Sequence, residues 1–206
     1  MPRTSQQNEE IRQKRIKEIL TAAMHVYLEK GVRGSEIGDI AERAGIARGL
    51  VYHYYKDKLS LFRALFEQSQ ESARAFINST LNTEQPPLVR LQTFFQHFMR
   101  STLEQPYYVR FYSTLHYDAP LVYGDEAQSF METFANSVFG PLRRVMREAM
   151  DEGVIREADP NLAANLFWGA IVGGMNEFMQ RPDAPIFEVR LKQLMELTFE
   201  GFLAKR

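Results

Sequence analysis

The sequence predicts an all-α protein of about nine helices. Apolar residues recur at spacings of three and four along most of the 206 residues, which is the periodicity of amphipathic helices. No segment alternates apolar and polar residues between hairpin turns, so no strand is predicted. Glycines and prolines separate the helical stretches.

Three helices are expected in succession at the N-terminus. The first covers residues 12–30 and ends at Gly31, because glycine readily adopts the left-handed conformation that terminates a helix. The second covers residues 35–43, where the hydroxyl of the leading serine can cap the free amides of the first turn. A left-handed turn at Gly45 leads to the third helix, at residues 47–54.

Prolines mark where most of the later helices are expected to begin, because proline is tolerated in the first turn of a helix and disrupts its interior. The expected helices are 57–80, 86–105, 106–116, one from just after Pro120 to 152 with an interruption or kink near Gly140 and Pro141, 159–180 and 185–204. We expect a three-helix domain at residues 1–58 and a second helical domain at residues 59–206.

The composition narrows the possible chemistry. The chain has no cysteine, which excludes disulfides and thiolate ligands. The longest apolar run, residues 166–175, is too short to cross a bilayer, and the N-terminus lacks the apolar stretch of a secretory signal. We therefore expect a cytoplasmic protein.

Charge is distributed unevenly, although the net charge is only −1. Residues 1–60 contain 11 Lys and Arg against 8 Asp and Glu, whereas residues 61–206 contain 14 against 18. Phosphate binding needs a basic face rather than a basic protein. A mildly basic N-terminal part is compatible with binding to nucleic acid.

The second and third expected helices, joined by a tight turn at residues 44–46, have the spacing of a helix-turn-helix, in which the second helix enters the major groove. Val51 and Tyr55 lie four residues apart and are expected to face inward. The remaining side chains of the third helix can then reach bases and phosphates. The predicted DNA-binding residues are Ser35, Arg48, Gly49, Leu50, Tyr52, His53, Tyr54 and Lys58.

Residues 12–62 resemble the N-terminal signature of the tetracycline-repressor (TetR) family. The matching positions are Gly31, Ser35, Ile37, Asp39-Ile40-Ala41, Ala44-Gly45-Ile46, Gly49, Tyr52, Tyr54-Tyr55-Lys56 and Lys58-Leu59. Glu36 stands where the family often has Thr or Ser, so no phosphate contact is expected from Glu36. The resemblance implies a homodimeric transcription regulator that binds an inverted repeat in double-stranded DNA, most often a repressor released by a small molecule.

Residues 86–180 are rich in aromatic residues and methionine, most of which are expected in the core. The family resemblance implies a ligand cavity among these helices, and an aromatic lining with a few polar groups suits a hydrophobic, ring-bearing or acyl-chain effector. The predicted ligand-binding residues are Phe94, His97, Phe98, Tyr108, Tyr112, His116, Asn136 and Trp168.

The last two expected helices carry more small and apolar residues than one neighbour can cover. The family resemblance implies a four-helix dimer interface built from this pair. The predicted interface residues are Gly169, Gly173, Leu194 and Phe199. An alternative, in which the glycines merely pack inside one subunit, stays open.

An enzyme is the main alternative class. The histidines at 25, 53, 97 and 116 lack metal-site spacing, and no phosphate-binding glycine loop or nucleophile elbow occurs. We expect no catalytic activity, no cofactor and no metal. A ligand-independent regulator or an activator of the same fold stays open, as does a bundle that binds only proteins, although a bundle of that kind would not need Arg48, Tyr52 and Lys58.

Overall fold

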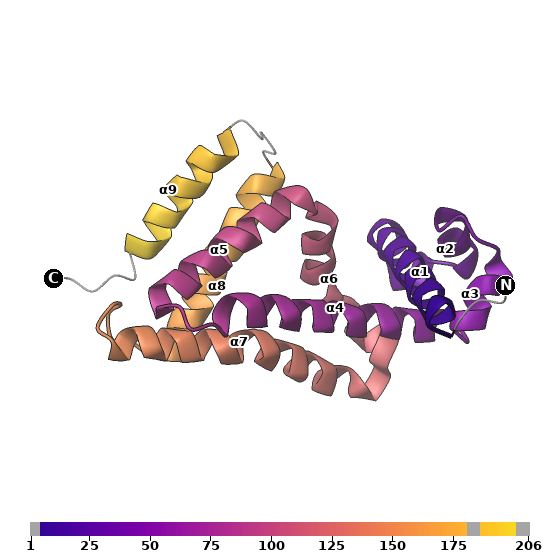
Figure 1. Ribbon diagram of the computed structural model, residues 1–206, viewed down its shortest axis with the longest axis horizontal. Helices are drawn as coiled ribbons and strands as arrows, with labels where there is room; N and C mark the ends of the chain where they lie inside the picture. The colour runs from indigo at the N-terminus through magenta and orange to yellow at the C-terminus, as the bar shows by residue number, and fades with distance from the viewer. Residues whose placement is uncertain (1–4, 181–185, 201–206) are drawn as a thin grey trace. The chain divides into compact units, whose positions relative to one another are not determined.

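The structure, a computed structural model, describes residues 5–180 and 186–200. Within these ranges it contains nine α-helices, one short 3₁₀-helix and no strand (Figure 1). This confirms the predicted all-α fold. The elements are α1 (Ser5–Gly34), α2 (Ile37–Arg43), α3 (Arg48–Tyr54), α4 (Lys58–Leu81), α5 (Pro87–Glu104), α6 (Pro106–Tyr123), η1 (Gly124–Glu126), α7 (Ala127–Asp151), α8 (Pro160–Gln180) and α9 (Phe187–Glu200).

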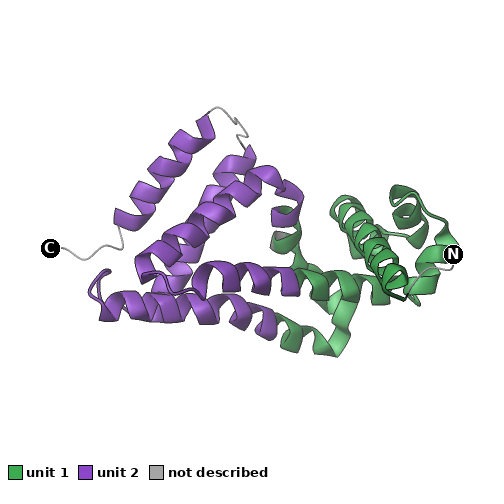
Figure 2. Cartoon of the chain, viewed as in Figure 1, with its two compact units in different colours: residues 1–70, 110–131 green, residues 71–109, 132–206 purple. Residues whose placement is uncertain are grey.

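The chain forms two compact units (Figure 2). The first comprises residues 1–70 and 110–131, and the second comprises residues 71–109 and 132–206. Helices α4, α6 and α7 each pass from one unit into the other. The functional boundary predicted between residues 58 and 59 stays a prediction.

Aromatic side chains form the centre of the first unit. The ring of Tyr27 on α1 lies 6.0 Å from Phe62, 5.9 Å from Phe66 and 5.2 Å from Phe111, measured between ring centroids. All four side chains are buried, and tilted or edge-on contacts of this kind add to the free energy gained by burying the rings. The first half of α4 and the first half of α6 therefore complete the core against which α1 packs.

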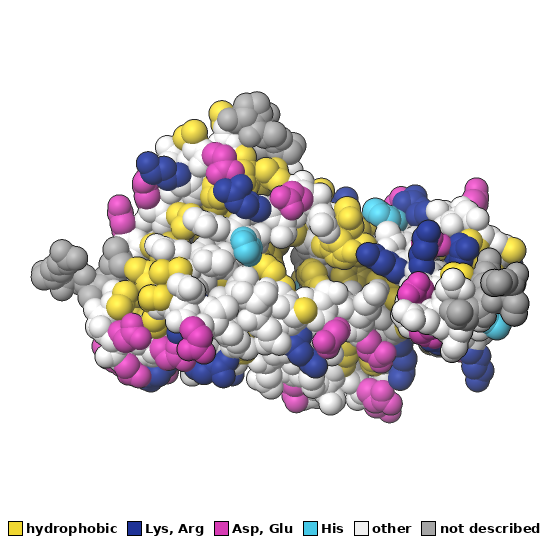
Figure 3. All heavy atoms as spheres, viewed as in Figure 1, with side chains coloured by type: hydrophobic (Ala, Val, Ile, Leu, Met, Phe, Trp, Pro, Cys, Tyr) yellow, Lys and Arg dark blue, Asp and Glu magenta, His cyan; other side chains and the backbone are white. Residues whose placement is uncertain are grey.

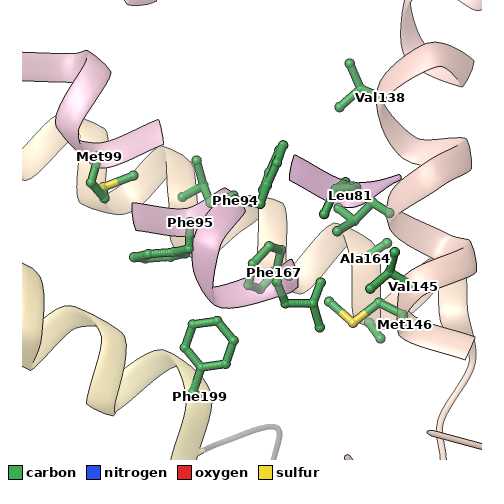
Figure 4. Close-up of a cluster of buried hydrophobic side chains, with 14 of the residues drawn as sticks. Leu81, Phe94, Phe95, Met99, Val138, Val145, Met146, Ala164, Phe167 and Phe199 are labelled. Atoms are coloured by element: carbon green, nitrogen blue, oxygen red, sulfur yellow. The ribbon is translucent and has the colours of Figure 1, made fainter. Parts of the chain in front are cut away.

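The second unit is held together by a cluster of buried apolar side chains from α4, α5, α6, α7, α8 and α9. Phe167 of α8 is fully buried, and its ring lies 5.8 Å from those of Phe95 on α5 and Phe199 on α9. Figure 4 shows these rings together with Met146 of α7. Phe199 thus packs against the core of its own subunit, and its predicted place in a dimer interface stays a prediction.

The start of α2 differs from the prediction. The expected break at Gly31 is present, with a backbone φ of 65°. The N-cap of α2 is Glu36, whose backbone N–H donates to Oδ2 of Asp39 at 3.2 Å. Ser35 does not cap the helix, because its hydroxyl is buried and donates to the carbonyl oxygen of Gly31 at 2.6 Å.

Two prolines that were expected to end or interrupt helices lie inside them. Helix α6 continues through Pro120, and the chain turns only at Gly124, which has a φ of 56°. A buried apolar stripe at helical spacing favours the longer helix and outweighs the lost backbone donor. The stripe consists of Leu115, Ala119 and Val122. Helix α7 also remains one helix across Pro141. The expected ends of the last helix, at 185 and 204, lie outside the described residues.

Candidate nucleic-acid interface

The turn between α2 and α3 is closed by two backbone hydrogen bonds. The N–H of Gly45 donates to the carbonyl oxygen of Glu42, and the N–H of Ile46 donates to that of Ala41, both at 3.0 Å. This pair of bonds is a Schellman motif, which requires a left-handed residue, and Gly45 has a φ of 66°. Gly45 therefore fixes the direction in which α3 leaves α2.

A lysine ties the start of α4 to the segment that precedes α2. The ammonium of Lys58 donates to the carbonyl oxygen of Ser35 at 2.8 Å and to that of Arg33 at 3.1 Å. The phosphate contact predicted for Lys58 stays a prediction, but the structure gives this residue a positioning role that sequence reasoning missed. Ser35 is buried, and a role for it in DNA binding stays a prediction.

Helix α3 presents one face to the core and another to solvent. Val51 is fully buried, as predicted. Tyr55, which follows α3, is half-buried, and burial raises the pKa of its hydroxyl. A Cβ added at Gly49 would meet no atom, so the backbone there is open to approach. The remaining predicted residues of α3 are exposed or half-buried: Arg48, Leu50, Tyr52, His53 and Tyr54.

The guanidinium of Arg48 lies against Tyr52, one turn further along α3. Nη2 of Arg48 is 3.2 Å from the Tyr52 hydroxyl oxygen, and Cζ is 5.6 Å from the ring centroid. This hydrogen bond raises the pKa of Arg48, so the group stays cationic. The other N–H donors of the guanidinium can address a base edge or a phosphate.

A groove of about 380 Å³ lies between the N-terminal part of α1 and the end of α3. Asn8 and Arg12 of α1 line it together with His53 and Tyr54. Neither Asn8 nor Arg12 was among the predicted site residues, and Asn8 lies before residue 12, where the first helix was expected to begin. A signal was present, since Arg and Lys residues cluster at positions 12–17. Figure 3 shows Lys and Arg side chains distributed over the visible face of α1–α3, with acidic side chains between them.

Three of the predicted ligand-binding residues meet in the second unit. The Phe98 ring lies 5.7 Å from Phe94 and 5.4 Å from Trp168. Phe139 extends this aromatic cluster, with its ring 5.7 Å from Trp168. His97 is exposed, with its ring 6.4 Å from that of Phe76.

The other predicted ligand-binding residues lie on α6 and α7. The Tyr112 hydroxyl donates to the carbonyl oxygen of Ser69 at 2.7 Å, and exposed His116 lies over Tyr117 at 3.7 Å. Both Tyr112 and His116 belong to the first unit. Asn136 is exposed, and Tyr108 packs on its neighbour Tyr107 at 4.8 Å. A ligand-binding role for any of the eight residues stays a prediction.

A different groove, of about 430 Å³, lies between α5 and α9 of the second unit. Apolar side chains of α9, Leu191, Met195 and Phe199, line it together with polar groups of α5. None of the eight predicted ligand-binding residues lines this groove.

Helices α8 and α9 expose apolar side chains beside small residues. Gly169 and Gly173 of α8 are exposed, and a Cβ added at either would meet no atom. Leu194 is half-buried, because it packs onto Gly174, where a Cβ would lie 2.4 Å from Cδ2 of Leu194. The exposed apolar residues of the two helices are Leu162, Leu166, Val172, Val189 and Leu197. A role for Gly169, Gly173 and Leu194 in dimerisation stays a prediction.

In residues 5–180 and 186–200, no group of three or more His, Asp or Glu side chains is placed to hold a metal ion. Over the same ranges, no helix combines the length and the apolar character needed to span a membrane.

Comparison with known proteins finds sequences that are similar to part of this chain. Residues 19–65 match the family model described as bacterial regulatory proteins, tetR family. The HTH-type transcriptional regulator AcrR of Shigella flexneri is 32% identical over 105 residues, which cover 50% of this chain and 46% of AcrR. The HTH-type transcriptional repressor KstR2 of Mycobacterium tuberculosis is 32% identical over 116 residues, or 54% of this chain and 50% of KstR2. The matches thus span about half the length of these relatives.

Solved structures share the fold over most of the chain. The structure of KstR2 aligns with a TM-score of 0.75 at 21% identity, covering 93% of this chain and 96% of KstR2. The structure of AibR in complex with isovaleryl coenzyme A and operator DNA aligns with a TM-score of 0.73 at 19% identity, covering 91% and 98% of the two chains. At these identities the likeness concerns the fold alone. Residues 19–65 are thus similar to the tetR family of bacterial regulatory proteins, and most of the chain shares the fold of these solved structures.

Proposed function

We propose that this chain is a sequence-specific DNA-binding regulator of transcription that recognises base pairs with α3. The observation that carries the proposal is the exposed face of α3, on which Arg48, Tyr52 and His53 surround the open backbone of Gly49. Arginine can pair through two hydrogen bonds with O6 and N7 of guanine in the major groove. The Schellman turn at Gly45 and the bonds of Lys58 hold α3 rigid, which specific recognition needs.

The proposal includes a homodimer formed through α8 and α9. The exposed apolar side chains of these helices are in contact with water in the single chain. A second copy offers an identical surface that can bury them in a two-fold interface. Gly169 and Gly173 leave room for the partner helix to approach closely. Such a dimer presents two α3 helices, which suits an inverted repeat with half-sites about 35 Å apart.

We also propose that a small hydrophobic effector controls DNA binding, and that the protein acts as a repressor released by that effector. The aromatic cluster of Phe94, Phe98, Phe139 and Trp168 offers stacking surface for a ring or an acyl chain. Among the relatives, KstR2 is named a repressor, and AibR was solved with an acyl-coenzyme A and operator DNA. In this proposal the protein has no catalytic activity. It resides in the cytoplasm and is associated with the nucleoid when it is bound to DNA.

The experiment is a selection of duplexes by the purified protein from a random-sequence pool. We expect repeated rounds to enrich an inverted repeat whose half-site centres are about one helical turn apart. The Arg48→Ala variant should enrich a less defined sequence, whereas Arg156→Ala, which removes one exposed positive charge from the segment between α7 and α8 in the second unit, should enrich the same sequence as wild type. A pool that stays random after selection by the wild-type protein would contradict the proposed function.

A further inference from the structure

We propose that Tyr52 is a positioning residue, which holds the guanidinium of Arg48 in the orientation in which Arg48 recognises a base. Tyr52 then contributes to sequence discrimination through Arg48 rather than through its own contact with DNA. The inference rests on the proposed function, because it requires that Arg48 contacts a base.

Two independent contacts fix the arginine. The Tyr52 hydroxyl accepts a hydrogen bond from Nη2 at 3.2 Å, and the guanidinium carbon lies 5.6 Å from the ring centroid. Residues four apart on a helix are neighbours, so this contact needs no distortion of α3. An interaction with the ring face sets the position of the guanidinium, and the hydrogen bond sets its rotation.

Arg48 needs such a restraint because little else in its surroundings holds it. It is the first residue of α3, it is exposed, and its long side chain loses conformational entropy when it is ordered on DNA. A guanidinium that is already oriented in the free protein loses less entropy on binding. This smaller loss of entropy favours binding only where Arg48 meets its matching base, so it raises the affinity for that sequence over other sequences.

The hydrogen bond from Tyr52 is also the strongest influence on the pKa of Arg48, and the attraction from the carboxylate of Glu36 is the weakest of those that act on it. Tyr52 thus keeps the guanidinium beside α3, where its remaining donors are available to a base.

Tyr54 provides a matched control on the same helix. Its ring packs edge-on against His53, with the centroids 5.3 Å apart. Removing the hydroxyl of Tyr54 leaves the contacts between Arg48 and Tyr52 intact. A loss that is specific to positioning should therefore follow Tyr52→Phe and not Tyr54→Phe.

The test is a double-mutant cycle on the duplex that the wild-type protein selects and on a scrambled duplex of the same length. We expect Tyr52→Phe to lower the ratio of the two affinities about fivefold, as loss of one hydrogen bond implies. In the Arg48→Ala background, the same substitution should change the ratio by less than about twofold. Tyr54→Phe removes a hydroxyl that is predicted to contact the phosphate backbone, so it should lower both affinities by the same factor and leave their ratio unchanged.

Three results would overturn the positioning role. An equal loss on both duplexes would show that the Tyr52 hydroxyl contacts phosphate directly. A full loss of specificity from Tyr52→Phe in the Arg48→Ala background would show that Tyr52 contacts a base itself. If the wild-type protein selects no sequence, the proposed function is contradicted, and so is the positioning role of Tyr52 that rests on it.

A second measurement tests the arrangement in the free protein, without DNA. The ring current of Tyr52 should shift the side-chain NMR signals of Arg48, and Tyr52→Leu should abolish this shift while Tyr52→Phe retains it in part. Signals of Arg48 that are identical in wild type and Tyr52→Leu would contradict the contact itself. This result separates failure of the inference from failure of the proposed function.

Discussion

The ammonium of Lys58 lies 2.8 Å from the carbonyl oxygen of Ser35, and this bond joins the first turn of α4 to the segment before α2. Ser35 is itself bonded to the carbonyl oxygen of Gly31 through its hydroxyl, at 2.6 Å, and through its backbone N–H, at 3.2 Å. Lys58 also bonds to the carbonyl oxygen of Arg33. A single side chain thus connects the end of α1, the start of α2 and the start of α4.

Lys58→Met should therefore lower the free energy of unfolding, by about 1–2 kcal/mol, because two backbone carbonyls lose a charged donor. The methionine retains most of the apolar stem, so the change tests the ammonium rather than packing. Urea denaturation of the variant is the measurement. Lys56→Met is the control, since Lys56 is exposed and its removal should leave stability unchanged. Equal midpoints for the two variants would contradict the positioning role of Lys58.

Gly45→Ala should be destabilising by about 1–2 kcal/mol, because a residue with a Cβ is strained at a φ of 66°. The substitution should also weaken DNA binding, since the turn sets the direction of α3. Gly38→Ala is the matched control: Gly38 lies inside α2, a Cβ there meets no atom, and alanine favours the helix. We expect chemical denaturation to show opposite effects for the two variants. Destabilisation of similar size in both variants would contradict the explanation based on the positive φ of Gly45.

Gly173→Leu should convert the proposed dimer to monomers without unfolding the subunit, because a side chain at residue 173 points into open space in the single chain. Gly174→Leu is the contrasting variant. A Cβ at residue 174 would lie 2.4 Å from Leu194 and 2.8 Å from Met99, so this change should destabilise the subunit itself. Sedimentation and thermal denaturation distinguish the two effects. An intact dimer in Gly173→Leu would place the interface elsewhere.

Helix periodicity predicted the all-α fold, because each helix buries one face and the apolar spacing records that face. It also predicted the break at Gly31 and the turn at Gly45, since both glycines have positive φ angles that other residues rarely adopt. The end of α6 was predicted wrongly. The local preference of proline places a helix boundary near Pro120. The burial of Leu115, Ala119 and Val122 at helical spacing favours a helix that continues through it.

In the candidate site too, the sequence predicts local features but not contacts between distant residues. The exposed face of α3 was predicted from the helical spacing of its residues, and the burial of Val51 was predicted correctly. The bonds of Lys58 join residues that are more than 20 positions apart, so no local pattern could predict them. Phe199 packs against the core of its own subunit, and sequence alone does not distinguish an apolar residue that meets its own subunit from one that meets a partner.

Trp168 offers a direct probe of effector binding, because it is the only tryptophan in the sequence and it packs between Phe98 and Phe139. A hydrophobic effector that enters the aromatic cluster should change the fluorescence emission of Trp168. We expect this change to have the same midpoint concentration as the release of DNA, and Phe98→Ala to weaken both. Acyl-coenzyme A thioesters of increasing chain length are suitable probes. Release of DNA with unchanged emission would place the effector elsewhere.

The most direct test of the account is the affinity of wild type and Arg48→Ala for the selected duplex and for a scrambled duplex at the same salt concentration. Wild type should prefer the selected duplex by a factor of about 10³ or more. Arg48→Ala should lose about 1–3 kcal/mol on the selected duplex and little on the scrambled one, because a base contact is lost only where the base is present. An equal loss on both duplexes would contradict base recognition by Arg48 and, with it, the assignment of α3 as the helix that recognises DNA sequence.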